Sequence, residues 1–268
     1  MRRKKFVVFF SVVWLLIPSV IAQTPSSDQE LIFPISADLF RSDVVMRTLY
    51  SITNLGPEVI VRFRFFNDTG ADFLSSSSLP IPPNGIFEEP RPLLIVVIEH
   101  IGWTRILVPS GAKIEGRETL QTFMRASGGG FQLVNSTQLN AVKPARRFHS
   151  TIANVSRFRS SVFGLAPVTE PDLRQTAFAI VNPSPNQTAT VNLTTLDPKG
   201  TLACSTSLTI SPQNRLARFG TEIFAPCQVP ALGSIEITSD LPIALGAVDV
   251  FFPEGRFSSV RVTAVETP

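Results

Sequence analysis

The residues that could do acid–base or metal chemistry are few and scattered. The chain has two histidines: His100 follows Glu99 at the end of an apolar run, and His149 lies in a basic stretch close to Arg147. A metal centre needs several His, Cys or carboxylate ligands at fixed spacing, and two isolated histidines do not provide it. We therefore expect surface histidines, no catalytic residues, no bound metal and no cofactor.

Two short motifs match catalytic patterns only in part. Ser110-Gly111-Ala112-Lys113 fits the S-x-x-K pattern of serine acyl-enzymes, but the companion S-D-N and K-T-G elements are missing. The run Gly128-Gly129-Gly130 lacks the G-K-[ST] ending of a phosphate loop. We interpret both segments as turns between strands.

The carboxylates are spread along the chain at turn-like positions. Asp240 and Glu254 are candidates for a Ca²⁺ site, because exported β-proteins often use loop carboxylates for this ion. No D-x-D-x-D run supports them, so we expect no metal here either.

Cys204 and Cys227 are the only cysteines. An even count in an exported chain favours a disulfide, which would stabilise the fold by about 3 kcal/mol in the chain-entropy view. A redox or nucleophilic role would need a C-x-x-C spacing or an activating histidine nearby in sequence. We predict a structural disulfide between Cys204 and Cys227.

Trp103 is the one aromatic residue that we consider as a ligand contact. Outside the first 22 residues it is the only tryptophan, and Tyr50 is the only tyrosine. Sugar-binding β-proteins commonly display exposed aromatic platforms, which this chain lacks in number. Packing in the core is the alternative role for Trp103, and we favour it over ligand contact.

The first 22 residues have the pattern of a secretory signal peptide. Four basic residues precede an apolar run that is broken by Pro18, and Val20-Ile21-Ala22 offers a small-residue cleavage site. Removal of this segment leaves 20 basic and 21 acidic residues, a net charge of −1. We expect a secreted, extracellular or periplasmic protein with no stable membrane span after cleavage, and the charge gives no support for nucleic-acid binding.

The segment 176–202 resembles the segment 48–70, and this repeat organises the chain. Tyr50-Ser51-Ile52-Thr53-Asn54 aligns with Phe178-Ala179-Ile180-Val181-Asn182, and an alternating apolar run begins seven residues after each Asn. A turn with Gly follows in both copies. Farther on, Gly102 aligns with Gly233 and Gly116 with Gly246. Five landmarks in one order indicate an internal duplication.

Alternation with period two, many prolines and no long helix-period segment predict an all-β protein. We expect two tandem immunoglobulin-like antiparallel β-sandwich modules after the signal peptide. The predicted divisions are residues 1–22 for the signal peptide, 31–135 for the first module, 136–162 for a connector that could itself contribute a strand, and 163–268 for the second module.

The second half carries the pattern N-P-S…D-x-x-G…L-x-I-x-P-x-N…G-S-I-x-I-x-S-x-x-P-I-x-x-L-G. It resembles exported bacterial proteins, abundant in acidobacteria, with tandem immunoglobulin-like β-sandwich repeats. The resemblance covers most of residues 45–265, and its motifs are turn and core residues. It implies a fold and a compartment, and it carries over no functional residue.

From these observations we expect a non-catalytic secreted or cell-surface protein with a structural, adhesive or protein-interaction role. Its partner would be a protein or a glycan at the cell surface. A carbohydrate-binding protein is the first alternative and depends on exposure of Trp103. A periplasmic pilus-type chaperone ranks lower, because its cleft Arg–Lys pair has no counterpart here, and an enzyme ranks last.

Overall fold

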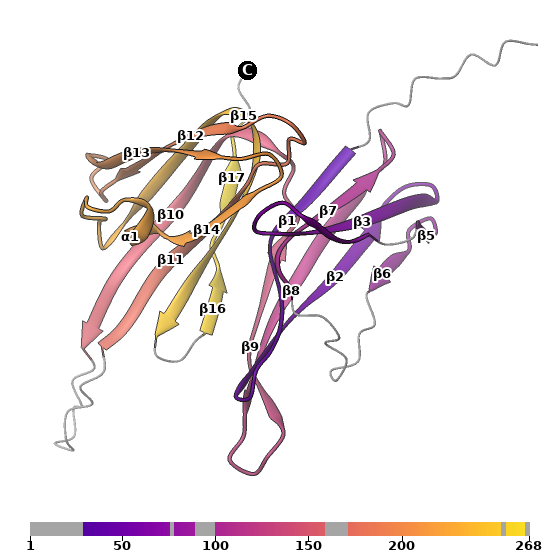
Figure 1. The fold of residues 1–268 in the computed structure, drawn as a ribbon, viewed down its shortest axis with the longest axis horizontal. Helices are drawn as coiled ribbons and strands as arrows, with labels where there is room; N and C mark the ends of the chain where they lie inside the picture. The colour runs from indigo at the N-terminus through magenta and orange to yellow at the C-terminus, as the bar shows by residue number, and fades with distance from the viewer. Residues whose placement is uncertain (1–28, 76–77, 89–99, 159–170, 253–255, 266–268) are drawn as a thin grey trace, which may run out of the picture.

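The computed structural model describes residues 29–75, 78–88, 100–158, 171–252 and 256–265. These residues form an all-β, sandwich-like protein with two curled antiparallel sheets side by side (Figure 1). Within them the only helix is the single turn α1 (Gly220–Ile223). The all-β prediction is therefore confirmed. The predicted signal peptide lies outside the described residues.

Nine of the described strands make the first sheet, here called the first module. Its order is β4-β3-β7-β1-β2-β8-β9, with β5 paired to β3 and β6 to β2. The strands are β1 (Gln29–Phe40), β2 (Val44–Asn54), β3 (Val59–Asn67), β4 (Asp72–Ser75), β5 (Leu79–Ile81), β6 (Ile86–Glu88), β7 (His100–Val108), β8 (Ile114–Arg125) and β9 (Phe131–Asn140).

The other eight described strands make the second sheet, here called the second module. Its order is β13-β12-β15-β10-β11-β14, with β16 paired to β15, β17 to β10, and β15 also to β11. The strands are β10 (Ala145–Phe158), β11 (Pro171–Val181), β12 (Ala189–Leu196), β13 (Leu202–Ile210), β14 (Arg215–Phe219), β15 (Leu232–Phe252), β16 (Arg256–Ser259) and β17 (Val262–Ala264).

The two modules have the same strand order once β15 is counted twice. The first part of β15 pairs with β10 and β12, as β7 pairs with β1 and β3. Its second part pairs with β11 and β16, as β8 pairs with β2 and β9. In both modules a short strand, β6 or β14, adds to the second strand of the module. The repeat in the sequence thus corresponds to equivalent strands.

The aligned asparagines at the ends of β2 and β11 make equivalent hydrogen bonds. Each side-chain amide lies within 2.6–3.2 Å of three backbone carbonyl oxygens. These belong to Pro57, Ile81 and Pro82 for Asn54, and to Gln187, Ile210 and Ser211 for Asn182. Buried Asn donors and loop carbonyls satisfy one another, so both loops take the same path over the sheet.

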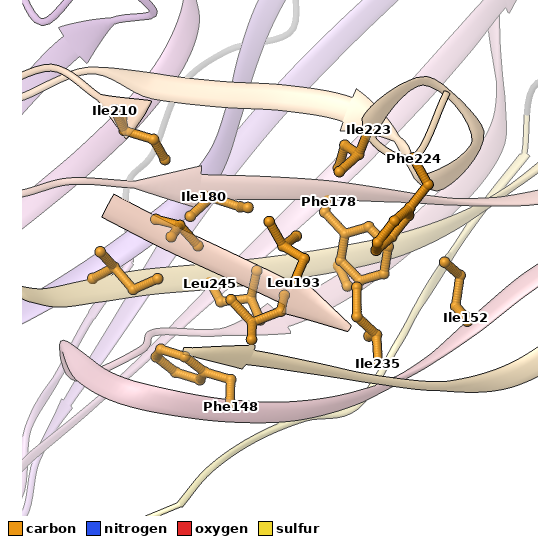
Figure 2. Packing of buried hydrophobic residues seen from close by; sticks show 14 of the residues in the cluster. Phe148, Ile152, Phe178, Ile180, Leu193, Ile210, Ile223, Phe224, Ile235 and Leu245 are labelled. Atoms are coloured by element: carbon orange, nitrogen blue, oxygen red, sulfur yellow. The ribbon is translucent and has the colours of Figure 1, made fainter. Parts of the chain in front are cut away.

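The core of each module follows from strand alternation. On β12, Ala189, Val191 and Leu193 are buried while the residues between them are more exposed, as period-two patterning predicts. Figure 2 shows the core of the second module, in which Phe148, Phe178 and other apolar side chains from several strands meet.

The predicted connector at 136–162 contains the second half of β9 and all of β10. The chain changes from one sheet to the other within residues 141–144, and Val142 forms a bridge back to Ile32. The basic residues that suggested a linker include exposed positions of a strand, such as Arg146. Strand alternation with an exposed polar face explains this composition.

Candidate functional site

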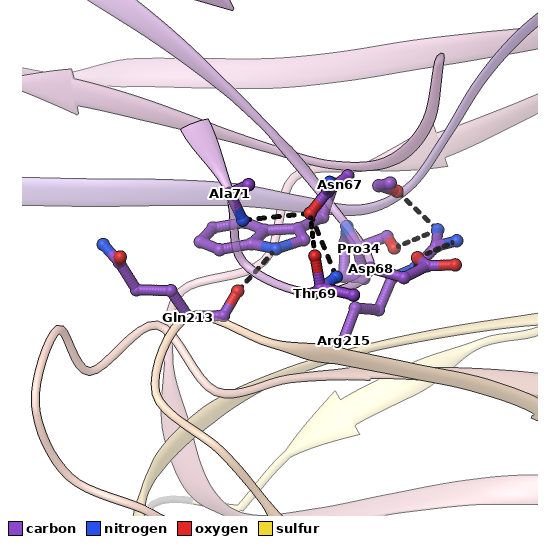
Figure 3. Close-up of polar contacts among 9 residues, drawn as sticks. Pro34, Asn67, Asp68, Thr69, Ala71, Gln213 and Arg215 are labelled. Atoms are coloured by element: carbon purple, nitrogen blue, oxygen red, sulfur yellow. Dashed lines mark hydrogen bonds and ion pairs between the residues drawn. The ribbon is translucent and has the colours of Figure 1, made fainter. Parts of the chain in front are cut away.

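The two modules meet at a buried cluster centred on Trp103. Trp103 on β7 has none of its surface exposed and stacks on Phe66 of β3, with ring centroids 4.2 Å apart. Val181 and Ala244 of the second module pack in the same cluster. The indole N–H donates to the backbone carbonyl of Gln213 at 3.0 Å, which joins β7 to a loop of the other module (Figure 3).

Arg215, the first residue of β14, crosses the same junction. Its Nε and Nη2 atoms lie 2.7 and 2.6 Å from Oδ1 of Asp68, and its Nη1 donates to the carbonyls of Pro34 and Gly102. The Arg215 side chain is 4% exposed. All three guanidinium nitrogens have partners in the first module (Figure 3), as a buried charge requires.

The loop that carries Asp68 is ordered by its own hydrogen bonds. Oδ1 of Asn67 accepts from the backbone N–H groups of Thr69 and Ala71 at 3.0 and 2.9 Å. Gly70 has a φ of +78°, and a Cβ atom built there would lie 2.9 Å from the carbonyl carbon of Gln213. Only glycine fits both the backbone angle and the close approach.

A bulge in β1 makes the next contact between the modules. Phe33 and Ser36 pair with Thr104 and Gly102, so two residues, Pro34 and Ile35, lie between partners that are two apart on β7. The equivalent stretch of β10 has one residue in that place. The extra residue moves the chain outward against β15.

Gly246 on β15 receives this bulge. A Cβ atom built at Gly246 would lie 3.2 Å from Cβ of Pro34 and 3.4 Å from the side chain of Ile35. Gly116 pairs with Ile52 and faces the interior of its own module, whereas Gly246 pairs with Ala179 and faces the bulge of the other. The alignment of Gly116 with Gly246 expected from the sequence is therefore off by one residue in the strands. Two cavities, of about 270 and 620 Å³, adjoin the contact between Gly246 and the bulge, and Ile35 lines both.

The larger cavity contains a buried acid, Glu118 of β8. Its neighbours on the same strand face, Gly116 and Leu120, are buried too. The Glu118 side chain is 0% exposed, lines the cavity, and has no hydrogen-bond partner on either carboxyl oxygen. Burial raises the pKa of this carboxyl well above its ordinary value, and the charge of Arg215 lowers it in part.

A hydrogen-bonded chain of hydroxyl groups lies beside Glu118. Tyr50 pairs with Glu118 across β2 and β8. The Tyr50 hydroxyl is 2.5 Å from that of Ser36 and 2.7 Å from that of Thr104, and all three residues are buried. Burial raises the pKa of Tyr50 well above its ordinary value, and the Glu118 carboxyl adds to the rise.

The residues predicted as sites are not brought together. The disulfide between Cys204 and Cys227 is confirmed; it joins β13 to the loop before β15 in the second module. Trp103, considered as a ligand contact, is enclosed between the modules and presents no face to solvent. Its packing role is therefore the one that the geometry accommodates.

The remaining candidates lie apart as well. His149 is exposed on β10, the side chain of His100 lies outside the described residues, and Ser110 begins the turn between β7 and β8. Oδ1 of Asp240 accepts from the backbone N–H of Thr190 at 2.8 Å, and Glu254 lies outside the described residues. Among the residues described, no three His, Cys, Asp or Glu side chains form a group that could hold a metal ion.

Sequence reasoning missed Arg215 and Glu118. Arg215 gives no local signal, because its partners come from more than a hundred residues away. Glu118 does give one: on β8 it occupies the inward phase of an alternating strand, between Gly116 and Leu120. An acid at such a position is a candidate for function, since carboxylates are rarely buried without a partner.

No family model, curated protein or solved structure matches this chain. The described part of the chain contains no helix with the length and apolar character needed to cross a membrane.

Proposed function

We propose that this chain is a non-catalytic protein of the cell exterior or periplasm whose two immunoglobulin-like modules act as one rigid scaffold for interaction. The observation that carries the proposal is the junction built from Trp103, Arg215 and Asp68. Modules that only follow one another on a chain commonly share small, polar contacts. This junction instead encloses an indole and a guanidinium.

A fixed angle between modules suits a protein that holds other components in place. The edge strands and end loops are then presented at constant separation, which reduces the ordering cost of binding at two points at once. The disulfide supports a compartment outside the cytoplasm, because such bonds persist under oxidising conditions. The predicted signal peptide at residues 1–22 agrees with this compartment.

The experiment is binding of residues 23–268 to envelope fractions and whole cells of the source organism, and to a glycan array. These residues retain every described strand. We expect saturable binding to the envelope without selectivity for a sugar. Asp68→Ala should weaken envelope binding, because it removes the carboxylate that holds Arg215 and loosens the junction.

The matched control is Asp72→Ala, since Asp72 pairs with Arg64 at the exposed edge of the same sheet. It should leave binding unchanged. Sugar-selective binding would support the carbohydrate-binding alternative instead. Equal binding by the wild type and Asp68→Ala would show that the fixed junction has no part in the interaction.

A further inference from the structure

The larger cavity between the modules has the features of a ligand site. Its volume is about 620 Å³, within the range of small-molecule pockets. Its walls come from both modules: β1, β8 and β9 on one side and β10, β15 and β17 on the other. Most of the lining is apolar, as in sites that enclose the body of a small organic molecule.

The second module shows which type of residue the shared strand arrangement accommodates at the position of Glu118. Tyr50 of β2 is equivalent to Phe178 of β11, and Tyr50 pairs with Glu118 as Phe178 pairs with Ala247. Ala247, which is 1% exposed, therefore occupies the position of Glu118. An apolar residue therefore fits this position in the same strand order. A carboxyl group there, with no hydrogen-bond partner, lowers stability rather than raising it. A ligand that pairs with the carboxyl is a physical reason for its presence.

The other charged group near Glu118 is already occupied. Arg215 interacts electrostatically with Glu118, but its guanidinium is bound by Asp68 and by two backbone carbonyls. A second positive group is needed to make a full ion pair with Glu118. The basic side chains that line the cavity, Lys143 and Arg261, are exposed to solvent, so a positive group that pairs with the buried Glu118 would come with the ligand.

We propose that the cavity binds a small organic amine with an apolar body, whose ammonium group pairs with the carboxylate of Glu118. The apolar walls contact the body, and the ammonium donates hydrogen bonds to the two oxygens that lack partners. The Glu118 side chain has no exposed surface in the free protein, so ligand binding requires its carboxyl group to rotate toward the cavity that the side chain lines.

Basic side chains at the rim of the cavity distinguish two classes of amine ligand, a simple amine and an amino acid. Lys143 and Arg261 line the same cavity and are exposed. A simple amine uses Glu118 alone. An amino acid with an apolar side chain also offers a carboxylate, which the two basic side chains attract.

The test is calorimetric titration of residues 23–268 with three probes of similar shape: isoamylamine, L-leucine and isoamyl alcohol. We expect both amines to bind and the alcohol to bind at least tenfold more weakly. Tighter binding of L-leucine than of isoamylamine would assign a role to the basic rim, and equal binding would assign the affinity to Glu118. Both of these outcomes support the proposal.

Two variants and one control complete the test. Glu118→Gln keeps the shape of the side chain and removes its charge, so it should weaken amine binding at least tenfold. Ser259→Trp, at an exposed rim position, should block the cavity while leaving Glu118 in place. Glu115→Gln, an exposed residue of the same strand, should change nothing.

No binding of either amine to the folded wild-type protein would overturn the proposal. So would an affinity for the alcohol equal to that for the amine, or unchanged amine binding in Glu118→Gln.

Discussion

The two modules share a strand order but not an interior. At four equivalent positions the first module has Ser36, Tyr50, Thr104 and Glu118, and the second has Ile152, Phe178, Ile235 and Ala247. All eight are buried. The equivalence of Ser36 and Ile152 follows from hydrogen bonds next to them: the N–H of Ala37 donates to Thr48, and that of Ala153 to Thr176, both at 2.8 Å.

This difference shows which features belong to the scaffold and which to one copy. An apolar interior is sufficient for the fold, because the second module has one. The polar interior of the first module adds hydrogen bonds that nearly compensate for burial, and one acid that does not. The second module also has the disulfide, while the first depends on its neighbour to cover Trp103.

The largest expected effect is that of Trp103→Ala. It removes a buried ring, its stacking on Phe66 and its bond to Gln213, so we expect a loss of about 3–5 kcal/mol in the free energy of unfolding. Denaturant titration measures this loss. Trp103→Phe is the control and should lose less. A loss below about 1 kcal/mol for the alanine variant would mean that the ring is not enclosed as described.

Removal of the disulfide should destabilise the second module more than the first. Replacing Cys204 and Cys227 together by Ser should cost about 3 kcal/mol. Amide hydrogen exchange should then become faster in β12 and β13 than in β3 and β7. Equal acceleration in both modules would argue that they unfold as a single unit and that the disulfide does not act locally.

The Arg215 contact should have a smaller effect. Arg215→Met keeps the apolar stem but leaves Asp68 and two carbonyls without their donor, and we expect a loss of about 2 kcal/mol because Asp68 is itself half exposed. Arg218→Met, an exposed neighbour on the same strand, should change stability by less than about 0.5 kcal/mol. Similar losses in both variants would contradict a role for Arg215 at the junction.

The smallest effect is a pH dependence from Glu118. Because its pKa is raised in the folded protein, the folded state holds this proton more tightly than the unfolded chain. The associated stability is fully present below the unfolded pKa and is lost as the pH rises through the folded pKa. Glu118→Gln should therefore be more stable than the wild type at neutral pH, by about 1–2 kcal/mol. The two proteins should converge near pH 4 in thermal unfolding, and a constant difference across pH would contradict this origin.

The sequence predicted much of the fold and little of the site. Alternating runs such as that of β12, and the paired Asn54 and Asn182, could be recognised because strand period and turn chemistry are local. The equal strand order follows from that repeat. The bulge at Pro34 and Ile35 could not be anticipated, since it is an insertion of one residue in a strand whose equivalent lay in the predicted connector.

The site depends on contacts between distant segments. Trp103 could be singled out by its rarity, but whether its ring is exposed depends on Val181 and Ala244 in the other module. Arg215 is one of many arginines in the sequence, and its partners are fixed only when the modules meet. Strand alternation could predict that Glu118 is buried, but it could not predict that the carboxyl group lacks a hydrogen-bond partner.

The most direct test of the account is a pair of substitutions at the equivalent positions Glu118 and Ala247, with an apolar residue at the first and an acid at the second. The thermal stability of Glu118→Val and Ala247→Glu would be compared with that of the wild type at neutral pH. If the first module carries an acid that the scaffold does not need, Glu118→Val should melt higher than the wild type and Ala247→Glu should melt lower. A lower melting temperature for Glu118→Val would contradict the account, because it would show that Glu118 is part of what holds the fold together.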